Sequence, residues 1–145
     1  MATHNPLIIK QLQSNNWRDF QLVEPMTWHT DGGDIYVPAG FVTDFASIPR
    51  AVWSWLPPYG RWSAAAVVHD YLTRLHANDM AHPLAPTRAD CDRIFYDALK
   101  ELRVSRLDRS VMWLAVRAAS LLFGWGGRRR VAALEEERRR ILDIA

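Results

Sequence analysis

The sequence predicts an α+β fold, in which a small N-terminal antiparallel β-sheet is followed by a bundle of about four helices. Two observations support this prediction. Between residues 6 and 43, short segments with alternating apolar residues are separated by turn-forming residues, as in paired strands. From residue 63 onward, apolar residues recur three and four positions apart, as on helix faces. A chain of 145 residues favours one domain, which we place at residues 1–127, with residues 128–145 as a charged C-terminal helix.

The strand region is divided by turn signals. A short strand is expected at Pro6–Leu12. Phe20–Trp28 has apolar residues at even positions and contains a proline, which predicts one strand with a kink or bulge. The Asp-Gly-Gly sequence within Thr30–Asp34 predicts a tight turn, because glycine tolerates positive φ. Ile35–Val37 would then pair back as a hairpin, and Phe41–Thr43 would continue as a strand.

The helical region contains three regular segments and one charged segment. Ser63–His76 has the most regular helical spacing. Thr87 is suited to cap the next helix, because an acidic residue stands at the capping-box position three residues later. Leu107–Phe123 is apolar nearly all round, which favours a central place in the core. Arg128–Ile144 carries dense charge of both signs and only a thin apolar stripe, so it needs a surface to pack on. We expect it to dock on the domain, on a second copy of the chain or on another phage protein.

Two apolar stretches, Phe41–Arg50 and Val68–Leu72, contain charged residues where burial is expected. A buried charge is costly unless it is paired or coordinates a metal. His69 and Asp70 are neighbours on a helix, so their side chains project about 100° apart. Helix packing across the loop that follows can bring the next helix near His69. The residues that we consider as metal ligands, and as catalytic candidates, are His69, Asp70, Asp92 and Asp44.

These four residues leave two hypotheses open. In the first, they hold a divalent metal, because imidazole and carboxylate groups are suitable ligands, and the protein is a hydrolase. In the second, the same groups form a buried polar network in which Asp44 or Asp92 holds Arg50, His69 or Arg88 and fixes the sheet to the helices. No complete catalytic set is visible in the sequence, so no cofactor follows from it except a divalent metal under the first hypothesis.

A second group of residues suggests a binding surface. Aromatic side chains surround the Pro57-Pro58 pair, where a rigid loop could hold a sugar, a peptide or a protein, or could instead close the sheet onto the helices as part of the core. The binding candidates are Arg50, Trp53, Trp55, Tyr59, Trp62 and Arg88.

Four motifs resemble a known family. They are Val37–Arg50 (VPAGFVTDFASIPR), Ala65–Leu72 (AAVVHDYL), Cys91–Leu99 (CDRIFYDAL) and Met112–Arg117 (MWLAVR). Their order and spacing resemble the DUF1353 family of phage and prophage proteins of unknown function. This resemblance implies a bacteriophage or prophage setting and no established chemistry. The His-Asp pair is also similar to the metal motif of HD-type phosphohydrolases, although the upstream His residues here lie in the strand region.

Composition narrows the setting further. The single cysteine, Cys91, excludes an internal disulfide, and the N-terminus has no signal-peptide pattern. No apolar run is long enough to span a bilayer. Together with the phage setting that the resemblance implies, these features make the host cytoplasm or the virion the expected location. Two arginine triplets, Arg128–Arg130 and Arg138–Arg140, occur without a nucleic-acid-binding motif. We therefore expect other phage proteins, or a second copy of the chain, as partners rather than nucleic acid.

The function that we predict is that of a phage accessory or virion-associated protein acting through protein contacts. The alternative is a small metal-dependent hydrolase acting on a cell-wall or phosphate substrate.

Overall fold

The computed structural model of the protein describes residues 4–12, 19–43, 62–123 and 139. Within these residues, short antiparallel strands come first and three helices follow, which confirms the α+β fold with its N-terminal sheet region. The prediction of about four helices was too high for the described part of the chain. The additional helix predicted at 128–145 lies outside the described residues, apart from Arg139.

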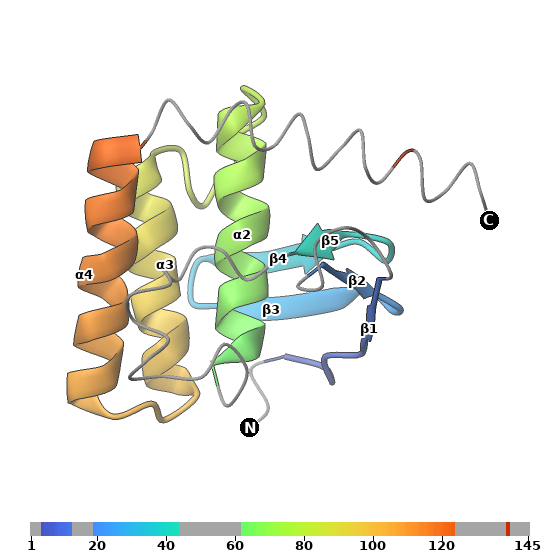
Figure 1. Cartoon of the computed structure of the whole chain (residues 1–145), viewed down its shortest axis with the longest axis horizontal. Helices are drawn as coiled ribbons and strands as arrows, with labels where there is room; N and C mark the ends of the chain where they lie inside the picture. The colour runs from blue at the N-terminus through green and yellow to red at the C-terminus, as the bar shows by residue number, and fades with distance from the viewer. Residues whose placement is uncertain (1–3, 13–18, 44–61, 124–138, 140–145) are drawn as a thin grey trace.

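The described strands form two small antiparallel sheets instead of one (Figure 1). The three-stranded sheet has the order β1-β2-β5, with β1 at Ile9–Gln11, β2 at Phe20–Leu22 and β5 at Val42–Thr43. The two-stranded sheet is a hairpin of β3 (Met26–Thr30) and β4 (Gly33–Val37). Both sheets contribute almost completely buried side chains to the core, including Leu22, Trp28 and Ile35.

The single kinked strand predicted over Phe20–Trp28 is wrong. The chain leaves the first sheet after Leu22 and enters the second sheet at Met26, so the segment contributes to both. Pro25 lies at the break and has no backbone N–H with which to continue a strand ladder. The predicted hairpin is confirmed, because Thr30 pairs with Gly33 across a two-residue turn.

The helices are α2 (Ser63–Ala77), α3 (Arg88–Glu101) and α4 (Arg106–Phe123). The capping box predicted at the start of α3 is confirmed. The Asp90 backbone N–H donates to Thr87 Oγ1 at 3.1 Å, and the Thr87 backbone N–H donates to Asp90 Oδ2 at 3.1 Å. These two bonds fix the N-terminus of α3 and therefore the direction in which Asp92, in its first turns, can point.

The central helix is α2, which lies between the sheets and the other two helices (Figure 1). It contacts β4 and β5 on one side and α3 on the other, and its first half is buried nearly all round. By contrast, α4 packs on α3 at the edge of the molecule, and Met112 and Val116 are its fully buried residues among the described side chains. The prediction that Leu107–Phe123 is central is therefore wrong, and the other described elements do not cover its outer leucines.

Candidate functional site

A buried hydrogen bond joins α2 to α3 in the middle of the apolar core. His69 Nε2 lies 2.7 Å from Asp92 Oδ1, and the two side chains are 3% and 0% exposed. The His69 ring also packs against Phe95, with the ring centroids 4.9 Å apart. Because a carboxylate accepts at Nε2, the Nε2–H of His69 donates this bond. The charged residues that seemed out of place in the apolar motifs are therefore paired with each other across two helices.

The same carboxylate also binds α4. Arg117 Nη1 donates to Asp92 Oδ2 at 2.9 Å, and Ser120 Oγ donates to Asp92 Oδ1 at 3.4 Å. Arg88, at the start of α3, extends the group by donating from Nη2 to Ser120 Oγ at 3.4 Å. Asp92 thus connects all three described helices, and each of its two oxygens is in use. We call these five residues the interhelical cluster.

The electrostatics of the interhelical cluster favour the ionised form of Asp92. Burial by itself raises the pKa of Asp92, because the charged form is desolvated. The hydrogen bonds and charge of His69, with further bonds from Arg117 and Ser120, outweigh burial, so that the pKa of Asp92 is lowered from its ordinary value of 3.8. The negative charge is stabilised by these neighbours, and both carboxylate oxygens of Asp92 accept hydrogen bonds from them.

Two buried nitrogen atoms of this cluster, His69 Nδ1 and Arg88 Nε, have no hydrogen-bond partner among the residues that the structure describes. The contact with Asp92 uses Nε2 of His69, so that Nδ1 is the ring nitrogen left for another group. A neutral imidazole can bind a metal through this nitrogen, which lies on a side chain that is 3% exposed.

A second polar group, which we call the strand–helix cluster, lies where β5 meets α2. Thr43 Oγ1 donates to Asp70 Oδ2 at 2.6 Å, and Arg74 Nη2 lies 3.8 Å from the same oxygen. Arg74 Nη1 also donates to the carbonyl oxygen of Val42, and its guanidinium lies 4.5 Å from the centre of the Phe41 ring. Arg74 therefore fixes the last described strand to the central helix.

The predicted site residues are divided between these clusters. His69 and Asp92 meet, whereas Asp70 faces β5, as the angle of about 100° between neighbouring helical residues requires. Trp62 packs against the core, and its buried Nε1 has no hydrogen-bond partner within the described ranges. The remaining candidates Asp44, Arg50, Trp53, Trp55 and Tyr59 lie outside the described residues. Among the residues that are described, no group of three or more His, Cys, Asp and Glu side chains is placed to hold a metal ion.

Sequence reasoning missed Arg117, Ser120 and Arg74 as members of the clusters. Arg117 carried a signal, because it is the single charged residue between Ser110 and Phe123. A lone charge in an apolar helix needs a buried partner or access to solvent. Arg74 had a similar signal, because it follows Asp70 by one helical turn.

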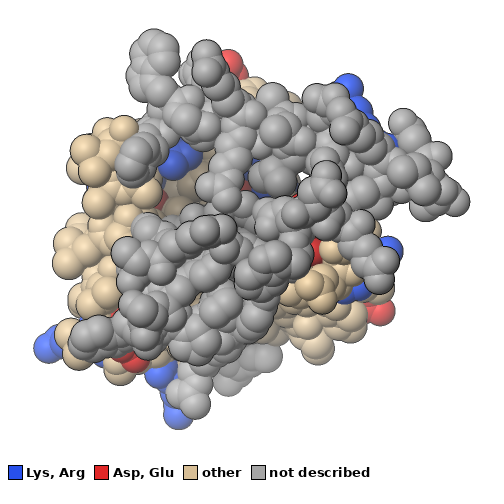
Figure 2. Space-filling model, viewed as in Figure 1, with Lys and Arg blue, Asp and Glu red and all other residues tan. Residues whose placement is uncertain are grey.

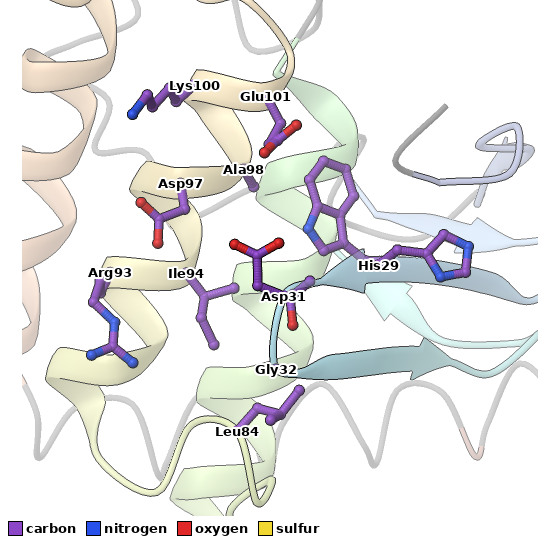
Figure 3. A pocket seen from close by; sticks show the side chains of 12 residues that line it. His29, Asp31, Gly32, Leu84, Arg93, Ile94, Asp97, Ala98, Lys100 and Glu101 are labelled. Carbon is purple, nitrogen blue, oxygen red and sulfur yellow. The ribbon is translucent and has the colours of Figure 1, made fainter. Parts of the chain in front are cut away.

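A separate pocket of about 460 Å³ lies between the β3–β4 turn and the outer face of α3 (Figure 3). Asp31 of the turn points toward Asp97 of α3, and Glu101 lies one turn further along the same helix. Arg93 and Lys100 add positive charge, so the lining has mixed sign. This pocket shares no lining residue with either polar cluster.

The fold and the clusters define a class: a small α+β protein whose three described helices are joined by a buried His–Asp–Arg contact. The model of a family described as protein of unknown function (DUF1353) matches residues 20–116. Because this match covers more than half of the chain, the protein belongs to the DUF1353 family, as its motifs indicated. No curated protein and no solved structure matches the chain. No helix in the described ranges is long and apolar enough to cross a membrane.

Proposed function

We propose that this protein is an accessory or virion-associated protein of a tailed bacteriophage or prophage that acts by binding other proteins. The observation that carries the proposal is the outer face of α4, where Leu107, Leu114, Leu121 and Leu122 are 60–74% exposed. Large exposed apolar patches on soluble proteins mark interaction sites. Figure 2 shows that the edge formed by α4 is largely free of charged atoms. Lys or Arg atoms lie near the lower end of this edge. The phage setting rests on the resemblance of the four motifs.

The interhelical cluster has a structural role in this proposal. Asp92 is fully buried and both of its oxygens accept hydrogen bonds from other helices. A buried ion pair of this kind contributes little net stability compared with apolar packing, but it is costly to break and it specifies which faces meet. Its members therefore set the arrangement of α2, α3 and α4, which in turn presents the leucine face of α4 outward.

The second candidate is the metal-dependent hydrolase acting on a cell-wall or phosphate substrate. It is favoured by one observation: Nδ1 of the buried His69 has no hydrogen-bond partner in the described part of the chain. A metal there would require carboxylates beyond Asp92, and the described part of the chain supplies no such group. The residue that could complete a set of metal ligands is Asp44, which directly follows Thr43 of the strand–helix cluster in the sequence.

Two measurements test the proposed function. The first is isolation of phage particles from cells that carry this gene, followed by mass spectrometry of the particle fraction and of proteins bound to the tagged chain. We expect the chain either in the particles or in a complex with a phage protein. Its absence from both would contradict the proposal.

The second measurement is metal analysis of protein purified without chelator, with Zn²⁺, Mn²⁺ and Fe²⁺ added back during thermal unfolding. We expect less than stoichiometric metal and no rise in Tm. Stoichiometric metal that is lost in His69→Gln would favour the hydrolase instead. This variant keeps an N–H donor for Asp92 but lacks the ring nitrogen Nδ1.

A further inference from the structure

The leucine face of α4 is opposite the buried face of the same helix. Met112 and Val116 are 0% and 1% exposed, whereas Leu114 is 60% exposed. Successive residues of a helix are rotated by about 100°, so that Leu114 projects about 200° away from Met112. The exposed leucines are therefore on the side of α4 that faces away from α3. Packing against the described helices therefore does not explain why these positions are leucine.

The spacing on this outer face is that of a helix-pairing seam. Leu107, Val111, Leu114, Ala118 and Leu121 follow one another at intervals of four, three, four and three residues. This is the alternation of a and d positions in a coiled coil. From Leu107 to Leu121 the seam is about 21 Å long at the helical rise of about 1.5 Å per residue. The occupant that fits such a seam is another apolar helix of similar length.

The distribution of charge on α4 favours a second copy of the same helix as the partner. Between Ser110 and Phe123 the one charged residue is Arg117, and its Nη1 donates to Asp92 on α3. Two copies of this face can therefore meet without burying an unpaired charge or bringing like charges together. The small residues beside the seam, including Ser110 and Ala115, allow a close approach, since the distance between packed helices depends on the side chains at the contact.

The ends of α4 favour an antiparallel arrangement. Within the described residues, the last turn of α4 has no basic side chain to complement the negative end of the helix dipole. Arg106 stands exposed at the opposite end. An antiparallel pair centred on Leu114 would bring Arg106 of each copy to the C-terminal end of the other α4, and Leu107 to Leu121 of the second copy.

We propose that two copies of this chain pair antiparallel through the outer face of α4, with Leu114 at the two-fold axis. The inference deepens the proposed function and rests on it, because it names a second copy as a protein that the exposed face binds. The dimer would cover the leucines that α3 leaves exposed, and residues outside the seam would remain free for phage proteins.

Cysteine cross-linking of the full chain tests both the partner and the orientation. Cys91 does not interfere, because it is fully buried and burial raises its pKa to about 12. After oxidation with diamide, we expect Leu114→Cys to form a disulfide-linked dimer by itself. Leu107→Cys and Leu121→Cys alone should each form no disulfide-linked dimer, since antiparallel pairing separates identical residues by about 21 Å. A mixture of the two should cross-link. Met80→Cys, 62% exposed and outside α4, is the matched control.

The dimer itself is measured by light scattering and sedimentation of the unmodified chain. We expect Leu114→Glu to weaken dimerisation by about 100-fold or more, because two carboxylates would meet at the axis. Val23→Glu, at a side chain 49% exposed in the sheet region, should leave the Kd of the dimer unchanged. A monomeric wild-type chain, cross-linking of every single cysteine variant, or a dimer unaffected by Leu114→Glu would each overturn the inference. The particle and metal measurements are independent of these outcomes, so a monomer that still enters phage particles would leave the proposed function standing.

Discussion

The inner and outer sides of the helical layer reverse the usual placement of charge and apolar surface. Inside, Asp92 and His69 are 0% and 3% exposed and are surrounded by apolar side chains. Outside, Leu121 and Leu122 are more than 70% exposed on a face without free charge. The inner charges are explained by contacts within the chain, because each has a partner of complementary charge or hydrogen-bonding capacity. The outer leucines have no such explanation within the described part of the chain, which is why we propose a partner for them.

The strongest test of this contrast removes the carboxylate at the centre of the interhelical cluster. Asp92→Ala leaves Arg117 and His69 facing a buried space without a partner. We expect it to lower the free energy of unfolding by about 3–5 kcal/mol, as for other buried pairs broken from one side. Urea denaturation measures this loss. Asp97→Ala, at an exposed position on the same helix, should change the value by less than about 0.5 kcal/mol. Similar losses in both variants would mean that the cluster is no more important than a surface charge.

The pH dependence of stability tests whether the ionised form of Asp92 stabilises the folded protein. Because the pKa of Asp92 is lowered below 3.8 in the folded protein, the folded state binds a proton there less readily than the unfolded state. Its contribution is therefore complete above about pH 4 and is lost as the pH falls through the lowered pKa. The difference in unfolding free energy between wild type and Asp92→Asn should be constant from pH 7 to pH 5 and should decrease at lower pH. A difference that increases at lower pH would mean that folding raises the pKa of Asp92 instead of lowering it.

A smaller effect is expected in the strand–helix cluster. Arg74→Met keeps an unbranched apolar stem of similar shape but removes the donor to Val42 and the charge beside Asp70. We expect a loss of about 1.5–3 kcal/mol, the range for hydrogen bonds to a charged group. Thermal and urea unfolding would measure it. Arg93→Met is the control, since Arg93 is 65% exposed and pairs with Asp90 on the surface, where ion pairs contribute about 0–1 kcal/mol.

The smallest effect is expected on the outer face. Measured at a dilution where the chain is monomeric, Leu114→Ala should change the unfolding free energy by less than about 0.5 kcal/mol. The same substitution at Leu99, which is fully buried, should cost about 2–5 kcal/mol. If Leu114→Ala in the monomer proved as costly as Leu99→Ala, the outer face would belong to the core of a single chain.

Local features were the ones that could be predicted from the sequence. The turn between β3 and β4, the capping box at Thr87, and the boundaries of α2 and α4 each depend on residues a few positions apart. The break at Pro25 was also visible, but a proline alone does not say whether the chain resumes in the same sheet or in another. Periodicity and turn chemistry act over one turn of helix or one strand pair, so a single sequence contains them in full.

The tertiary structure alone decided which charges meet and which apolar face stays uncovered. His69 and Asp92 are 23 residues apart and Asp92 and Arg117 are 25 apart, so their contacts follow from how three helices pack. The apolar residues all round α4 resembled those of a central helix, but α2 took that place between the sheets and α3. Apolar periodicity shows that a helix face avoids water, whereas packing determines whether the same chain or another protein covers it.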